Sequence, residues 1–70
     1  MKNRLSPVEY RILQLMAQGS TNAEIAREYN ITHKSVKTRI GSIRDKLGVP
    51  KDASREDMLA VAAEKGLIES

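Results

Sequence analysis

Signals that begin and end helices recur along the whole chain, and they constrain its fold more than any other feature. Ser6-Pro7-Val8-Glu9 and Thr21-Asn22-Ala23-Glu24 are capping boxes, in which a hydroxyl and a glutamate each bind the other residue's backbone N–H. Thr32 and the segment Ser54-Arg55-Glu56-Asp57 supply two more start signals. Each helix then meets a residue that tolerates a left-handed backbone: Gly19, Asn30, Gly48 or Gly66. The sequence therefore predicts an all-α fold of four helices, over about residues 7–18, 22–29, 33–47 and 55–65.

Apolar residues recur at helical spacing inside the expected helices, so each helix should bury one face. The first helix would bury Ile12, Leu13, Leu15 and Met16, and the third would bury Val36, Ile40, Ile43 and Leu47. Leu67 and Ile68 would fold back on this core. A chain of 70 residues makes one small domain, residues 1–70, and none of its segments alternates as a strand does.

Positive charge is concentrated in the third expected helix. Between residues 32 and 46, five Lys or Arg (34, 37, 39, 44 and 46) are opposed by one acid, Asp45, which gives 5 − 1 = +4, whereas the whole chain carries +3. The face opposite the apolar stripe is otherwise short and polar, with Lys34, Thr38 and Gly41. Such a face fits a groove lined by phosphates and base edges, but most charged helix faces are simply solvated. On this stretch alone, the two interpretations have about equal weight.

Composition excludes several other classes of function. The chain has no cysteine and one histidine, so a disulfide, a thiolate metal site and a structural zinc site are not expected. The longest apolar run, residues 58–63, is far shorter than the roughly 20 residues that span a bilayer, and no signal peptide is recognisable. An enzyme is disfavoured, because the sequence has no paired inward carboxylates and no phosphate-cradling glycine loop. We therefore expect a soluble, cytoplasmic protein without a cofactor.

A turn of only three or four residues separates the second and third expected helices, which is helix-turn-helix spacing. Over roughly residues 5–66 the chain resembles the LuxR/GerE-type helix-turn-helix family. The matching motifs are Leu5-Ser6-Pro7-Val8-Glu9, Ile12-Leu13, Gly19-Ser20-Thr21-Asn22-Ala23-Glu24-Ile25-Ala26, Ile31-Thr32, Val36-Lys37 and Lys46-Leu47-Gly48-Val49. The resemblance implies a four-helix DNA-binding domain whose third helix enters the major groove and whose fourth often pairs two subunits. No receiver or ligand-binding domain precedes the motifs, so the chain resembles the solitary, GerE-like form.

The resemblance also implies which residues contact DNA. Two would face base edges, Lys37 and Thr38, and four would meet the DNA backbone, Thr21, Asn22, Thr32 and Ser35. Helix capping alone also explains the two threonines at positions 21 and 32. Arg39 would contact a phosphate or form an ion pair with Glu28, and Ser42, on the same flank as Ser35, completes the expected set.

The roles of three positions in the third helix, Lys34, Lys37 and Gly41, each have an alternative. Lys34 and Lys37 would bind one phosphate and one guanine, in either order, unless both are merely solvated. Gly41 costs about 1 kcal/mol relative to alanine inside a helix. It marks either a close approach to the floor of the groove or a tolerant surface site.

The leading functional hypothesis is a sequence-specific regulator of transcription that binds double-stranded DNA as a homodimer. Leu59 and Ala63 of the fourth helix would form the dimer contact, unless they belong to the core. The alternative is a protein-interaction module or a sigma-region-4-like factor that contacts RNA polymerase or another regulator. The +4 helix favours DNA, because a protein-interaction module does not need it. Lys37→Ala would then relax the preference at one base, whereas Lys46→Ala would weaken binding to all DNA about equally.

Overall fold

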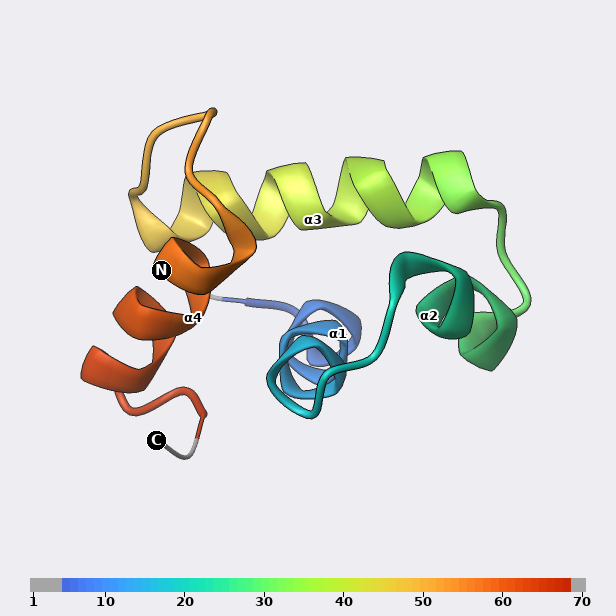
Figure 1. Cartoon of the computed structure of the whole chain (residues 1–70), viewed down its shortest axis with the longest axis horizontal. Helices are drawn as coiled ribbons and strands as arrows, with labels where there is room; N and C mark the ends of the chain where they lie inside the picture. Colours follow the sequence, from blue (N-terminus) through green and yellow to red (C-terminus); the bar gives the residue numbers. More distant parts are fainter. Residues whose placement is uncertain (1–4, 69–70) are drawn as a thin grey trace.

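The computed structural model describes residues 5–68, which form four helices and, within that range, no strand (Figure 1). The helices are α1 (Pro7–Ala17), α2 (Asn22–Tyr29), α3 (His33–Leu47) and α4 (Arg55–Glu64). All four begin at the expected residue, and α1 and α4 end one residue earlier than expected. The prediction of an all-α helix-turn-helix fold is confirmed.

The start signals act as caps in the folded chain. The hydroxyls of Ser6, Thr21 and Ser54 each accept the backbone N–H three residues later, and the acid at that later position accepts the N–H of the cap. Thr32 accepts the N–H of Ser35 at 3.1 Å. Asn30 ends α2 in the left-handed conformation, with φ at 53°, so the turn into α3 is set by local backbone chemistry.

The core is built from one apolar face of each helix. All eight residues that the sequence assigned to the buried faces of α1 and α3 are buried, and Ile25, Met58 and Ala62 join them from α2 and α4. Leu67 and Ile68 pack against this core as predicted, and the Gln14 side chain donates a hydrogen bond to the Leu67 carbonyl at 2.7 Å. Each fully buried large side chain contributes about 1.5–3 kcal/mol, which holds the four helices together.

The helices are arranged so that α3 crosses the other three (Figure 1). It packs on α1, α2 and α4, and all three lie on the same side of it in this view. Pro50 follows the end of α3, and a turn closed by the Ala53 N–H on the Pro50 carbonyl leads into α4. The other helices therefore leave the opposite side of α3 uncovered, and the connection from α3 to α4 rises above it at the C-terminal end of α3 (Figure 1).

Candidate nucleic-acid interface

The uncovered side of α3 carries exposed basic and short polar side chains. Lys34, Lys37 and Thr38 are all exposed. The Thr38 hydroxyl donates to the Lys34 carbonyl at 3.1 Å, so only its oxygen lone pairs and its methyl group remain for a ligand. A Cβ atom added at Gly41 would meet no other heavy atom within 4 Å, so packing inside the protein does not require glycine there.

The predicted DNA-contact residues divide between two flanks of α3. On one flank, a hollow of about 460 Å³ is lined by Lys34, Ser35, Thr38, Arg39 and Ser42 together with Ile31 and Glu9. On the other flank, a hollow of about 320 Å³ is lined by Asn22, Lys37, Ile40 and Arg44. Thr21 and Thr32, the caps of α2 and α3, are exposed. The structure therefore places these residues along and beside α3, around the start of α2.

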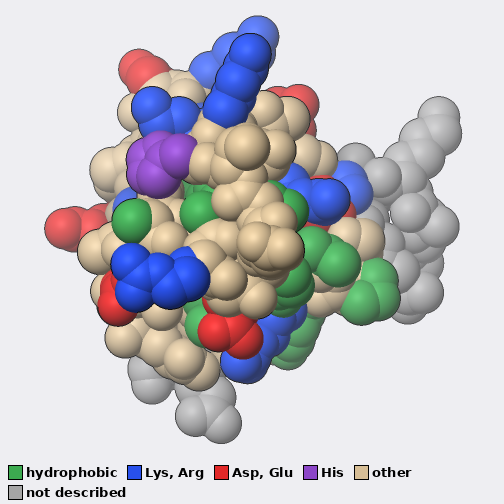
Figure 2. Space-filling model, turned by 90° about the vertical axis from the view of Figure 1, so that its right-hand side faces the viewer, with side chains coloured by type: hydrophobic (Ala, Val, Ile, Leu, Met, Phe, Trp, Pro, Cys, Tyr) green, Lys and Arg blue, Asp and Glu red, His purple; other side chains and the backbone are tan. Residues whose placement is uncertain are grey.

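The distribution of charge distinguishes the α3 side from the α2 end of the molecule (Figure 2). On the face shown, Lys and Arg side chains alternate with Asp and Glu and form no continuous patch. The most prominent basic side chains project from the upper edge, which is the side on which α3 lies. On this face, the basic side chains that project furthest therefore stand on the α3 side of the molecule.

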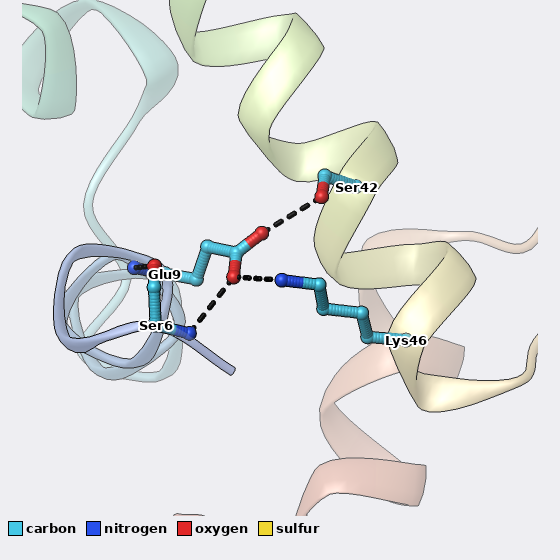
Figure 3. Close-up of polar contacts among 4 residues, drawn as sticks. All are labelled: Ser6, Glu9, Ser42 and Lys46. Carbon is cyan, nitrogen blue, oxygen red and sulfur yellow. Dashed lines mark hydrogen bonds and ion pairs between the residues drawn. The ribbon is translucent and has the colours of Figure 1, made fainter. Parts of the chain in front are cut away.

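A buried carboxylate joins α1 to α3 on the first flank (Figure 3). Glu9 is only 5% exposed, and its Oε2 accepts the Ser42 hydroxyl at 2.7 Å. Its Oε1 accepts the Lys46 ammonium at 2.5 Å and the Ser6 backbone N–H at 2.9 Å. The sequence had indicated only the capping role of Glu9. Ser42 therefore has an internal partner that was not predicted, and its hydroxyl hydrogen is already used.

The hydrogen bonds around Glu9 keep this carboxylate ionised. Burial by itself would raise the pKa of Glu9, but the bonds from Lys46, Ser6 and Ser42 outweigh burial and lower that pKa from 4.5 to about 2. The Lys46 side chain is 28% exposed and is held by this ion pair. The expectation that Lys46 is a general phosphate contact is not supported, because its charge already stabilises the fold.

The surroundings of Arg39 and Asn22 add two findings to the sequence analysis. Among the described residues, no ion pair joins Arg39 to Glu28, so the structure does not support this alternative for Arg39. The Asn22 side-chain oxygen accepts a hydrogen bond from Arg55 at 2.6 Å, and Arg55 also donates to the Ser20 carbonyl at 2.6 Å. The first residue of α4 therefore holds the start of α2, a contact for which the sequence carries no local signal.

The expected dimer residues occupy an intermediate position on α4. Leu59 and Ala63 are both half-buried, and Leu59 packs against the core. Both keep some accessible surface, which is available for contact with a second subunit.

The described residues also bear on a membrane-spanning helix and on a metal site. No helix among residues 5–68 is long and apolar enough to cross a membrane. The same part of the chain holds no group of three or more His, Cys, Asp or Glu placed to bind a metal ion.

Comparison with known proteins bears on the same elements. The sequence profile of the luxR family of bacterial regulatory proteins (GerE) matches residues 3–59, a segment that ends inside α4. The transcriptional regulatory protein LiaR of Bacillus subtilis (strain 168) is 51% identical over 45 residues, which is 64% of this chain. The chain spans only about a fifth of LiaR, 21% of its length. No solved structure matches the chain significantly. The family match includes the cap of α2, α2, the turn and α3, which carry every residue predicted to contact DNA.

Proposed function

Because the chain belongs to the luxR family of bacterial regulatory proteins, we propose that it regulates transcription by binding specific sequences in double-stranded DNA. The observation that carries this proposal is the uncovered side of α3, where exposed basic and short polar side chains stand beside the start of α2. The chain's similarity to LiaR, a transcriptional regulatory protein, adds support for a regulatory rather than an enzymatic role.

In this proposal, backbone contacts position the domain and α3 reads the bases in the major groove. Lys34 and the free N–H groups at the starts of α2 and α3 bind phosphates. Lys37 reaches guanine O6 and N7, while Thr38 offers its methyl group to thymine or its oxygen to a base amino group. Gly41 allows close approach to the floor of the groove. The remaining members of the proposed contact set are Thr21, Asn22, Thr32, Ser35, Arg39 and Ser42.

We further propose that two copies pair through α4, with Leu59 and Ala63 at the contact. A homodimer would read two half-sites about 34 Å apart, one helical turn of DNA. Support comes from the small residues on this helix, since Ala60 is exposed and Ala63 is half-buried, so a second helix can approach closely.

Duplex binding across a salt series tests the proposal. Fluorescence anisotropy would compare the wild type with Lys34→Ala/Lys37→Ala, and with Lys51→Ala/Lys65→Ala as a control. All four lysines are exposed, and the control pair lies outside α3, so both double variants lose the same charge. In a log–log plot, affinity falls with salt more steeply by about 0.9 for each phosphate that the protein neutralises. We expect the α3 variant to lose most of its affinity for duplex DNA and to show a shallower salt dependence. The control variant should lose little affinity.

The outcome also separates the two functional classes. If the two double variants lose affinity equally, net charge rather than α3 governs binding and the interface is wrongly placed. If the wild type does not bind duplex DNA even at low salt, the DNA function is refuted. A protein-interaction module, for RNA polymerase or another regulator, would then be the better hypothesis.

A further inference from the structure

Arg44 has an unusual place on α3. Its Nε atom is the buried side-chain nitrogen that has no hydrogen-bond partner among residues 5–68. A buried donor without a partner is unfavourable and rare in folded proteins, so it needs an explanation. Arg44 is half-buried and lines the hollow between α2 and α3.

The chemistry of that hollow is suited to an anion. Its lining residues are Asn22, Lys37, Ile40 and Arg44, so two cations and one amide surround an apolar floor. No carboxylate lines it, and the ion pair that the described residues form lies on the other flank, between Lys46 and Glu9. The charges of Lys37 and Arg44 are therefore uncompensated within this part of the protein.

The start of α2 adds to this preference. Asn22 is the first residue of α2, where backbone N–H groups lack partners in the helix and the helix dipole is positive. Arg55 holds the Asn22 side chain in place, so this end of the hollow is fixed by a contact with α4. Glu24, the acid in the first turn of α2, accepts the Thr21 N–H at 2.8 Å and does not line the hollow.

We propose that Arg44 is a phosphate-binding residue, which holds a DNA backbone phosphate in the hollow between α2 and α3. This inference rests on the proposed DNA function and adds a contact that the predicted set lacked. When the guanidinium turns toward the phosphate, Nε and one Nη bind two of its oxygens, which is the fork geometry that arginine favours. The contact thereby satisfies the donor that has no partner in the free protein. Because it engages the DNA backbone, it is independent of base sequence.

The test compares Arg44→Met with Arg11→Met on two duplexes of equal length, one rich in A·T and one rich in G·C. Methionine keeps an apolar stem at position 44 while removing the charge. Arg11 is an exposed arginine of α1 that lines a separate hollow with Gly66 and Leu67, so its loss is the matched change in net charge. We expect Arg44→Met to make the salt slope shallower by about 0.9 on both duplexes, and Arg11→Met to leave it nearly unchanged. Arg44→Lys should restore the slope, since it restores the charge.

Thermal unfolding separates a phosphate contact from a packing role. Arg44→Met removes a buried donor without a partner, so its melting temperature should equal or exceed that of the wild type. A lower melting temperature with an unchanged salt slope would make Arg44 a packing residue and overturn the inference. A change of salt slope on only one of the two duplexes would also overturn the inference, because that pattern indicates base recognition. If the wild type binds and the two methionine variants behave alike, only this inference fails, whereas a wild type that binds no duplex refutes the DNA function itself.

Discussion

Replacing Glu9 by glutamine should destabilise the fold strongly at neutral pH and hardly at all in acid. The folded protein lowers the pKa of Glu9 from 4.5 to about 2, which corresponds to about 3 kcal/mol of stability that depends on its ionisation. For a chain of 70 residues, total stability is expected to be about 4–10 kcal/mol. The loss would therefore lower the melting temperature by roughly 12–24 °C.

The pH range follows from the sign of the pKa change. A carboxylate whose pKa is lowered by folding stabilises the protein fully above its unfolded pKa. This contribution is lost as the pH falls from about 4.5 through about 2. The difference in unfolding free energy between the wild type and Glu9→Gln should shrink over that range and vanish near its lower end. Urea denaturation followed by circular dichroism, at several pH values, measures this difference.

Glu24→Gln is the matched control. Glu24 occupies the same position in the capping box of α2 as Glu9 does in α1, but it is exposed and forms no ion pair. Glutamine can serve in a capping box, so this variant isolates the effect of the cap. If the two variants lose equal stability at pH 7, the ion pair with Lys46 contributes nothing beyond the cap. If the deficit of Glu9→Gln persists near pH 2, its cause is not the ionisation of Glu9.

Two further substitutions test the proposed interfaces. Gly41→Ala should stabilise the fold by about 1 kcal/mol in thermal unfolding, because an added Cβ meets no atom of the protein, and it should weaken duplex binding in anisotropy. Unchanged affinity would show that Gly41 is only a tolerated surface residue. Ala63→Glu should weaken self-association in sedimentation velocity, whereas Ala17→Glu, which adds the same charge at an exposed position of α1, should not. Equal behaviour of these two glutamate variants would remove α4 from the dimer contact.

Local signals account for the parts of the fold that the sequence predicts. Each cap bonds a residue three positions away, and each apolar stripe repeats within four residues, so neither depends on how the helices pack. The contacts that the sequence did not indicate join residues far apart in the chain, as Glu9 with Lys46 and Arg55 with Asn22 do. The capping box of α1 already accounted for Glu9, so the sequence contained no separate signal for a partner on α3. One signal was available, since Ser42 and Lys46 are four residues apart and thus share a flank of α3.

The Glu9 ion pair changes the electrostatic argument for DNA binding. The +4 that the sequence places between residues 32 and 46 includes Lys46, whose charge Glu9 neutralises, so 4 − 1 = +3 remains for a ligand. The cations that remain lie on both sides of the uncovered face, with Arg39 lining one hollow and Arg44 lining the other. A major groove has a phosphate backbone on each wall, so cations on both flanks of one helix suit it better than a single basic face would. The position of the charges therefore supports the DNA hypothesis more than their number does.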